Sequence, residues 1–392
     1  MPLMSNPTTH QPLSERTSLF EFDLDSLVKE VEAMGLPRRT APQLLKWLYE
    51  KGVSDFELMT DLSKNARAQI AARFSIVQGT VIREQVASDG TQKLLISWPD
   101  ALGNAENTGD FATLSPAATP ADSRLRIAGD ESDRQTETVM IPTEDRRTAC
   151  VSSQVGCPVG CKFCASGIGG LDGNLSAGRI VEQVWRLGQL PGVGRISNVV
   201  FMGMGEPLAN FQSVTQAIRI INAPWGLGIG ARKITVSTVG VPAAIRKLCT
   251  FDVPVTLALS LHAPNDELRR SIIPWAEYST IAELLDACHE WFMKTGREIT
   301  LEYILLGGVN DAPHHAEELA SLARSMRANV NLIRYNEVKG MPFARPTNDA
   351  VRVFQETLRD RNVNAHIRAS RGRDIAAACG QLRHESRTQS SK

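Results

Sequence analysis

The sequence predicts an α/β protein: a partial barrel of six βα units, preceded by a small helical domain and a β-hairpin. Short apolar runs alternate with amphipathic helical patterns after residue 139. Strands of a parallel sheet are buried on both faces and need crossover helices, so this alternation indicates a parallel sheet or barrel. The chain has 392 residues, about twice what one ordinary domain needs, which leaves room for the accessory parts.

The N-terminal part has helical periodicity. Residues 1–20 are rich in Ser, Thr and Pro, and we expect a disordered tail there. Apolar residues with helical spacing begin at Leu24 and stop before Gly35, and two further amphipathic stretches follow. We therefore predict a helical accessory domain over residues 21–78.

A hairpin and an acidic insertion follow over residues 79–140. Two strand-like runs, at 81–86 and 93–98, are separated by Asp89-Gly90, a dipeptide that favours a tight hairpin turn. Residues 100–130 are expected to form a solvated acidic insertion, and a partner-binding loop is the less favoured alternative.

The predicted barrel covers residues 141–380, and residues 381–392 form a basic tail. Its expected strands are 149–152, 198–202, 233–237, 255–261, 299–305 and 330–334. The expected helices between them include 179–187, 214–221, 242–248, 281–293 and 316–326.

Composition limits the class of protein. The 43 basic residues balance the 43 acidic ones, which excludes a polycationic coat for nucleic acid but permits a local basic surface. No apolar run approaches the roughly 18 residues of a membrane span, and the N-terminus resembles no secretory signal. We expect a cytoplasmic protein, without membrane contact and monomeric.

The strongest chemical motif is a loop with three closely spaced thiols, Cys157, Cys161 and Cys164. A structural zinc site has four ligands, whereas this loop offers three thiols and no nearby histidine. Three cysteines on a four-iron cluster leave one iron free for a ligand that is not protein. The pattern thus favours a catalytic iron–sulfur centre over three incidental structural cysteines.

A CxxxCxxC loop with an aromatic residue before its last cysteine, at the opening of a βα barrel, resembles the radical S-adenosylmethionine (SAM) superfamily. The resemblance implies a [4Fe-4S] cluster on Cys157, Cys161 and Cys164, with the free iron chelated by SAM. One-electron reduction of SAM then gives a 5′-deoxyadenosyl radical. The protein binds and orients the reactants and excludes side reactions.

Four further stretches narrow the resemblance: 150–157 (CVSSQVGC), 203–207 (GMGEP), 260–265 (SLHAPN) and 378–382 (ACGQL). Together they resemble the RlmN/Cfr family of RNA adenine methyltransferases, over most of residues 20–385. The resemblance implies 23S rRNA and tRNA as substrates, adenine C2 as the methylated atom, and an electron donor such as flavodoxin or ferredoxin.

The resemblance also assigns catalytic roles. Adenine C2 is electron-poor and does not attack the methyl group of SAM, so the family first methylates a cysteine sulfur, here Cys379. A carbon radical on that methyl group adds to adenine, and Cys150 releases the adduct by forming a transient disulfide with Cys379. Glu137 matches the proton acceptor, although a thiolate could also take the C2 proton. Without the resemblance, both cysteines would be interpreted as small core residues and Glu137 as a solvated or ion-paired group.

Candidate SAM contacts come at the ends of the predicted strands, where barrel enzymes bind ligands. Taken singly, a serine could cap a helix, the histidine could be a satisfied core residue, and the asparagine could shape a turn. Asn336 is followed by Glu337-Val338 where many relatives have Asn-Pro. The candidates are Gly205, Glu206, Ser237, Ser260, Leu261, His262 and Asn336.

RNA contacts are expected from a basic stretch and from the helical domain. Residues 361–392 contain seven basic and two acidic residues, among them Arg368, Arg371 and Arg373, which could contact phosphates or simply form a solvated face. The target adenosine must turn out of its stack to expose C2. The candidates in the helical domain are Arg38, Arg39, Lys46 and Trp47.

Two rival functions stay open at this point. A Cfr-like enzyme would methylate C8 of adenine, and these motifs do not separate the two positions. A non-catalytic iron–sulfur or zinc RNA-binding protein would also explain the cysteine loop and the basic C-terminus, but it would not need Cys379.

Overall fold

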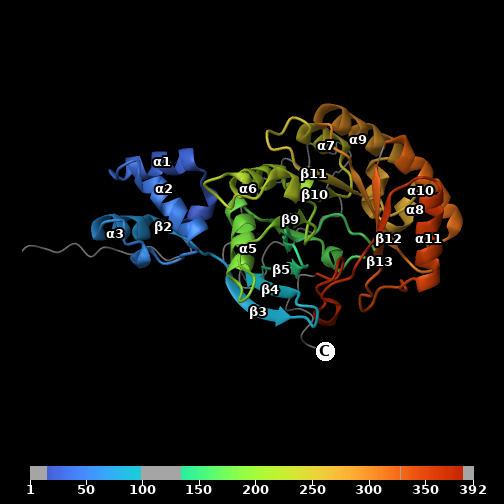
Figure 1. The fold of residues 1–392 in the computed structure, drawn as a ribbon, viewed down its shortest axis with the longest axis horizontal. Helices are drawn as coiled ribbons and strands as arrows, with labels where there is room; N and C mark the ends of the chain where they lie inside the picture. The colour runs from blue at the N-terminus through green and yellow to red at the C-terminus, as the bar shows by residue number, and fades with distance from the viewer. Residues whose placement is uncertain (1–15, 99–133, 327, 383–392) are drawn as a thin grey trace, which may run out of the picture.

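The computed structural model describes residues 16–98, 134–326 and 328–382 (Figure 1). The acidic insertion at 100–130, most of the expected N-terminal tail and most of the basic C-terminal tail lie outside these residues. No helix of the described part combines the length and apolarity that a membrane crossing requires.

The N-terminal residues form a helical lobe, as predicted. The lobe begins at Thr17, so residues 17–20, which were expected in a disordered tail, belong to it, and Leu19 and Phe20 are fully buried. Asp23 caps the first helix by accepting a hydrogen bond from Ser26 N at 2.7 Å, and Gly35 ends it with a φ of 74°. Strand β1 pairs in parallel with β2, so the two ends of the lobe lie together. Its elements are β1 Thr17–Ser18, η2 Leu19–Glu21, α1 Leu24–Ala33, α2 Thr40–Leu45, the π-helical turn η3 Lys46–Glu50, η4 Phe56–Leu58, α3 Lys64–Arg73 and β2 Phe74–Ser75.

The central sheet of the described fold has ten strands, in the order β14-β13-β12-β11-β10-β9-β6-β5-β4-β3, and β7 and β8 form a separate two-stranded sheet. The predicted hairpin turns at Gly90, whose φ is 81°, and its strands β3 and β4 continue the barrel sheet through antiparallel pairing of β4, β5 and β6. The strands are β3 Thr80–Val86, β4 Gln92–Ser97, β5 Gln135–Pro142, β6 Arg147–Cys150, β9 Asn198–Phe201, β10 Ile234–Thr238, β11 Thr256–Ser260, β12 Thr300–Leu305, β13 Asn329–Arg334 and β14 Ala365–Arg368.

The six predicted barrel strands are present as β6 and β9 to β13, all parallel, and β14 adds a further parallel strand that the sequence did not indicate. The helix before β14 was missed too, although its buried residues Val351, Phe354 and Leu358 follow helical spacing. The α-helices are α5 Ala177–Gln189, α6 Phe211–Asn222, α7 Pro242–Leu248, α8 Asp266–Ile272, α9 Ile281–Thr295, α10 Pro313–Ser325 and α11 Asn348–Asp360. The short elements are β7 Gln154–Gly156, η7 Ala165–Gly167, β8 Leu171–Asn174, η8 Pro207–Asn210, η9 Ala231–Lys233, η10 Pro274–Tyr278 and η11 Arg373–Ile375.

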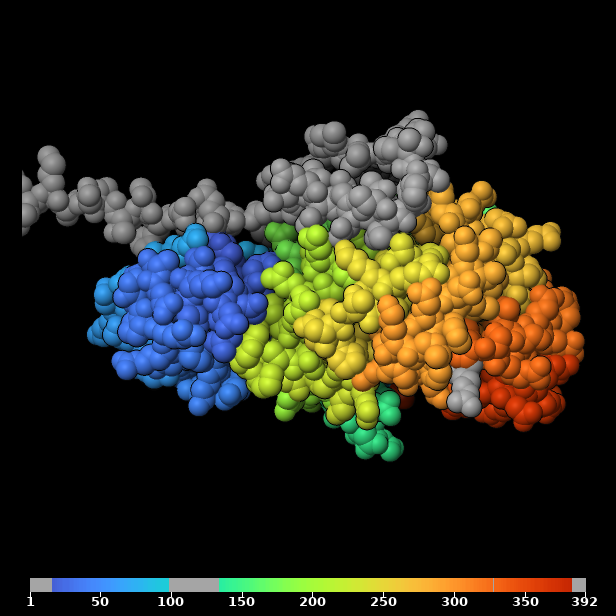
Figure 2. All heavy atoms as spheres, turned by 90° about the horizontal axis from the view of Figure 1, so that it is seen from above, coloured from blue at the N-terminus to red at the C-terminus, as the bar shows by residue number. Residues whose placement is uncertain are grey.

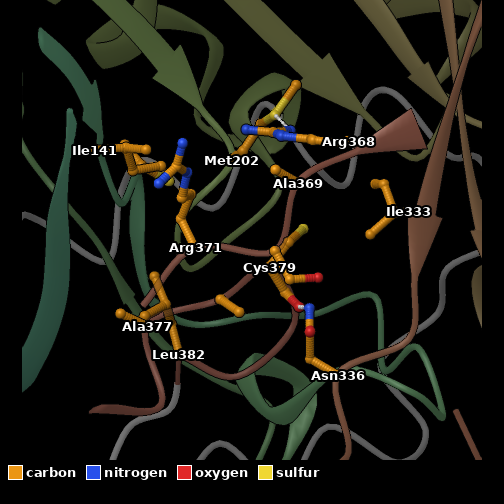
Figure 3. A pocket seen from close by; sticks show the side chains of 13 residues that line it. Ile141, Met202, Ile333, Asn336, Arg368, Ala369, Arg371, Ala377, Cys379 and Leu382 are labelled. Carbon is orange, nitrogen blue, oxygen red and sulfur yellow. Dashed lines mark hydrogen bonds between the residues drawn. The ribbon is translucent and has the colours of Figure 1, made fainter. Parts of the chain in front are cut away.

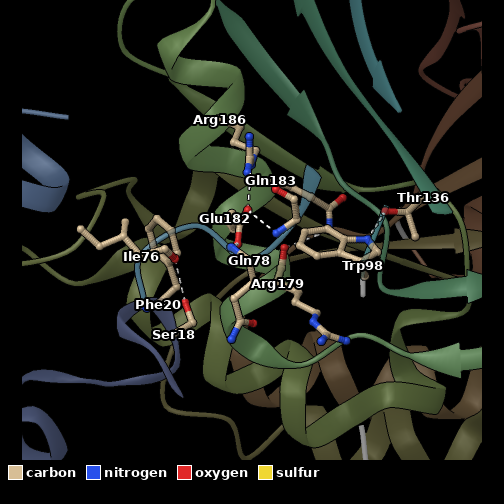
Figure 4. A network of polar contacts seen from close by, with 11 residues as sticks. Ser18, Phe20, Ile76, Gln78, Trp98, Thr136, Arg179, Glu182, Gln183 and Arg186 are labelled. Carbon is tan, nitrogen blue, oxygen red and sulfur yellow. Dashed lines mark hydrogen bonds and ion pairs between the residues drawn. The ribbon is translucent and has the colours of Figure 1, made fainter. Parts of the chain in front are cut away.

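The helical lobe forms one end of an elongated molecule, next to α5 and α6 (Figures 1 and 2). Its attachment depends on Glu182 of α5, which is fully buried. The carboxylate accepts hydrogen bonds from the backbone N–H groups of Gln78 and Gly79, at 2.9 and 3.0 Å, and pairs with Arg186 at 2.8 Å (Figure 4). One buried charge thus ties the segment between lobe and hairpin to the barrel.

We expect Glu182→Gln to destabilise the protein. An amide keeps the side chain's size, but it removes the charge that Arg186 and two buried N–H groups need, at a cost of about 2–4 kcal/mol. Urea unfolding followed by circular dichroism measures this change. The matched control is Glu290→Gln, because the Glu290–Arg246 pair is about half exposed and its loss should cost less than about 1 kcal/mol. Equal effects of the two substitutions would contradict the role given to Glu182.

Candidate active site

The cysteine loop leaves β7 and folds back on itself. Gly156 and Gly160 adopt φ angles of 76° and 70°, which favour glycine. Cys157 N donates to Gly170 O at 3.0 Å, and Cys164 N donates to Cys161 O at 3.1 Å. The three cysteines therefore face one region from a single turn of chain.

The three thiols fit an iron–sulfur cluster. All are half-buried, and burial raises the pKa of Cys161, which the negative charges of Cys164 and Cys157 raise further. The three sulfurs thus lie within electrostatic reach of one another and need a cation to become thiolates. Within the described residues no three His, Cys, Asp or Glu side chains converge on a single metal ion. A four-iron cluster does not require such convergence, because each thiolate binds a different iron.

The segment that carries Cys379 lies directly against this loop. Ala165 N donates to Gly380 O at 2.8 Å, and Ser166 Oγ donates to Leu382 O at 2.6 Å. From the other side, Asn336 Nδ2 donates to Cys379 O at 3.3 Å. The chain end, the cysteine loop and the segment after β13 therefore meet at one place.

Cys379 faces a pocket that Cys150 also lines (Figure 3). Cys379 is exposed to this pocket, whereas Cys150 is 7% exposed at the end of β6. Both are free thiols in this structure. The other lining residues are Ile141, Met202, Ile333, Asn336, Arg368, Ala369, Ser370, Arg371, Ala377, Ala378 and Leu382.

Arg368 is the cation shared by the two cysteines. Its guanidinium donates to Met202 Sδ at 3.1 Å (Figure 3). Burial raises the pKa of Cys150 to about 12, the charge of Cys379 raises it too, and Arg368 lowers it. Burial raises the pKa of Cys379 to about 11, and the positive charge of Arg368 again opposes this rise. Arg368 therefore lines the pocket beside Cys379.

Glu137 lies on β5 in a buried ion pair. Its carboxylate contacts Lys93 Nζ at 2.6 Å, with both side chains at most 11% exposed. Lys93 Nζ also donates to Ala376 O at 3.2 Å, three residues before Cys379. Glu137 is not one of the residues that line the pocket; the ion pair instead connects it to the segment that carries Cys379.

Six of the seven predicted SAM contacts lie at the carboxyl ends of β9, β10 and β11, whereas Asn336 follows β13 and lines the pocket of Cys379. Gly205 has a φ of 101°, and a Cβ there would lie 2.6 Å from Gln154 Cβ. Burial raises the pKa of Glu206 to about 7, and its two oxygens accept from Leu208 N and Val239 N. A ligand amine would therefore use the remaining lone pairs of this carboxylate.

The serine and histidine candidates line up on neighbouring strands. Ser237 Oγ lies 3.0 Å from Ser260 Oγ, and Leu261 is fully buried behind them. His262 Nδ1 accepts from Ile304 N at 3.1 Å, and burial lowers the pKa of the imidazole to about 3, so the ring is neutral. Its ring packs edge-on against Phe163 of the cysteine loop, with centroids 5.1 Å apart.

Sequence reasoning missed Met202, Lys93 and the pocket role of Arg368, because none belongs to the quoted motifs. The candidates of the helical lobe lie apart from this site; Trp47 there donates to Asp61 Oδ1 at 2.5 Å and stacks under Lys51. Of the two cysteines that belong to no motif, Cys288 is fully buried in the core and Cys249 is half-buried.

Comparisons with known proteins agree with this arrangement. The family model of the radical SAM superfamily matches residues 151–323, and that of the ribosomal RNA large subunit methyltransferase N-terminal domain matches residues 17–76. A crystal structure of a radical SAM methyltransferase from Sphaerobacter thermophilus aligns with a TM-score of 0.83 at 40% identity, over 94% of this chain and 100% of that one. The fold and the cysteine loop define a radical SAM enzyme, a class that uses a [4Fe-4S] cluster and SAM.

Curated relatives identify the family. The probable dual-specificity RNA methyltransferase RlmN of Gloeobacter violaceus is 43% identical over 357 residues, covering 91% of this chain and 92% of that protein. The Bacillus subtilis protein of the same description is 39% identical, covering 95% of each chain. The chain belongs to the RlmN family of dual-specificity RNA methyltransferases.

Proposed function

We propose that this enzyme methylates C2 of adenine in 23S rRNA and in tRNA, with Cys379 as the methyl carrier. The hydrogen bond from Ala165 N to Gly380 O carries the proposal, because it places the carrier segment against the cysteine loop. A non-catalytic RNA-binding protein needs no such juxtaposition. The resemblance to the RlmN family supplies the position of the methyl group.

Cys157, Cys161 and Cys164 would hold the cluster. The proposed SAM contacts are Gly205, Glu206, Ser237, Ser260, Leu261, His262 and Asn336. Together these groups supply a methyl group and one-electron chemistry at carbon. The pocket walls combine strand ends with residues 377–382, so the carrier cysteine lies among residues of the barrel.

The protein's own groups then act in order. Arg368 favours the thiolate of Cys379 as it accepts a methyl group on sulfur. After the methyl carbon has bonded to adenine, the RNA is held covalently through Cys379. Once the C2 proton has left, Cys150, in the same pocket, would attack the Cys379 sulfur as a thiolate. The S–S bond forms as the bond between the Cys379 sulfur and the methyl carbon breaks, and that carbon keeps the electron pair and takes up a proton to complete the methyl group. The methylated base is then free, and an external thiol reduces the disulfide before the next turnover. Glu137 would accept the C2 proton, and its pairing with Lys93 holds it in a defined position next to the carrier segment.

The substrate-binding regions are also proposed. Arg371 lines the pocket and would contact an RNA phosphate near the inserted base. Arg373 would be a second phosphate contact. The lobe at residues 21–78 would be an accessory RNA-binding domain, the strands within 79–140 an extension of the sheet, and 141–380 the catalytic barrel. We further propose a monomeric cytoplasmic enzyme that receives electrons from flavodoxin or ferredoxin.

Anaerobic reconstitution with iron and sulfide, followed by incubation with SAM, reductant and RNA, tests this function. Mass spectrometry of the digested RNA should show 2-methyladenosine. A methyl group at C8 would assign the Cfr-like activity instead, and an unmethylated RNA with an intact cluster would favour the non-catalytic binding protein.

Arg368→Gln should slow the reaction of the Cys379 thiol. Loss of the guanidinium raises the pKa of Cys379, so a smaller fraction is thiolate at any pH below that pKa. A shift of about one pKa unit would reduce the rate of alkylation by iodoacetamide about tenfold at pH 8. Peptide mass spectrometry measures the rate at each cysteine. Cys249, a half-buried residue at the C-terminal end of α7 that does not line the pocket, serves as the internal control, and Arg368→Lys should restore most of the rate.

A further inference from the structure

Arg269 is a buried cation in the wall between the SAM contacts and the cysteine loop. It lies on α8, directly after β11, and has no exposed surface. Nε donates to Leu261 O at 3.2 Å, and Nη2 donates to Val239 O. These carbonyls follow β11 and β10, so the guanidinium joins two strand ends that carry candidate SAM contacts.

The hydrogen-bonding and charge requirements of Arg269 are not met within the described residues. Nη1 is buried and has no hydrogen-bond partner there. No carboxylate of the described part forms an ion pair with this guanidinium; the nearest favourable charges are Cys161 and Asp266. An uncompensated buried charge is costly, so a fold keeps one where an anionic group is to be bound.

The cysteine loop packs on the end of the helix that carries Arg269. Lys162 N donates to Ile272 O at 3.0 Å, which fixes the loop to the end of α8. The three cysteines of the loop pack against an apolar cluster that includes Ile272 and Ile273. A cluster held by this loop would therefore lie next to the helix that contributes the buried guanidinium.

We propose that Arg269 is the buried counter-charge of the iron–sulfur cluster and raises its reduction potential. This inference depends on the proposed binding of the cluster by Cys157, Cys161 and Cys164. When an external one-electron donor reduces the cluster, its negative charge increases by one, and a nearby fixed cation stabilises the reduced form more than the oxidised form. In this role Arg269 acts through its charge on the cluster and is a positioning residue.

Redox titration of the reconstituted protein, followed by electron paramagnetic resonance, tests the proposal with three variants. Arg269→Gln keeps a hydrogen-bond donor and removes the charge, Arg269→Lys keeps the charge, and Arg270→Gln removes an exposed charge from the next position of the same helix. We expect Arg269→Gln to lower the ratio of reduced to oxidised cluster at a fixed potential about tenfold, equal to about 59 mV for one electron. The other two variants should stay within about threefold of the wild type.

The outcomes separate the alternatives. An unchanged cluster potential in Arg269→Gln would overturn the proposal. If SAM affinity falls in that variant while the potential is unchanged, the guanidinium binds SAM and the proposal is overturned as well. If Arg269→Gln loses the cluster and Arg269→Lys retains it, cluster binding itself requires a positive charge at position 269, which supports the proposal. If both lose it, the side chain is structural and the proposal fails. A wild-type protein without iron would instead overturn the proposed function itself.

Discussion

Cys379→Ala is expected to lower RNA methylation at least about 10³-fold, because no other group can carry the methyl carbon. The expectation follows from position: Cys379 is the exposed cysteine of the pocket, beside the cysteine loop. The contacts that hold its segment come from the backbone atoms of Gly380 and Leu382, which the substitution leaves in place. The visible absorption of the cluster should therefore be unchanged.

Methyltransferase assays and absorption spectra of the reconstituted variant measure these two effects. Cys249→Ala is the matched control, since Cys249 is a half-buried cysteine that does not line the pocket; it should keep wild-type activity. Substantial turnover by the Cys379→Ala enzyme would show that the carrier is another group. Loss of absorption together with activity would mean that Cys379 has a structural effect on the loop.

The βα order was predictable because it depends on local patterns. Six strands and most helices could be identified from apolar runs and spacing, and the cysteine loop from a motif of eight residues. β14 could not, because the sequence Ala-His-Ile-Arg has little apolar periodicity and gains its stability from pairing with β13. Because β14 was not predicted, Arg368, its last residue, was interpreted only as part of a basic stretch.

Contacts between distant segments could not be predicted from the sequence for a different reason. Lys93 and Glu137 meet because β4 and β5 pair with Leu95 opposite Glu137, a register that no local pattern fixes. The acid was expected to be a proton acceptor, with a solvated or ion-paired group as the alternative; the sequence did not indicate that its partner is Lys93 or that the pair is buried. The nearness of Cys150 and Cys379 followed only from the family resemblance, since neither residue has a helical or strand pattern that indicates its partner.

Cys150→Ala should separate formation of the RNA adduct from its release. Cys150 is buried and shares the pocket with Cys379, so it is placed to attack the Cys379 sulfur after the adduct has formed. Without it, methyl transfer to Cys379 and addition to adenine proceed, and the RNA stays attached to the protein. Multiple turnover should fall at least about 10²-fold, and the adduct should approach one RNA per enzyme.

A denaturing gel detects this adduct as a slow band that collapses on treatment with ribonuclease. The substitution removes one small sulfur from the core, at a cost of about 1 kcal/mol, so a thermal melt should show a folded variant. Cys150→Ser tests the chemistry at nearly constant volume, because a hydroxyl cannot form the disulfide, and it should trap the same adduct. Multiple turnover by both variants at the wild-type rate would rule out Cys150 as the releasing group. Inactive variants that form no adduct would place Cys150 in an earlier step than release.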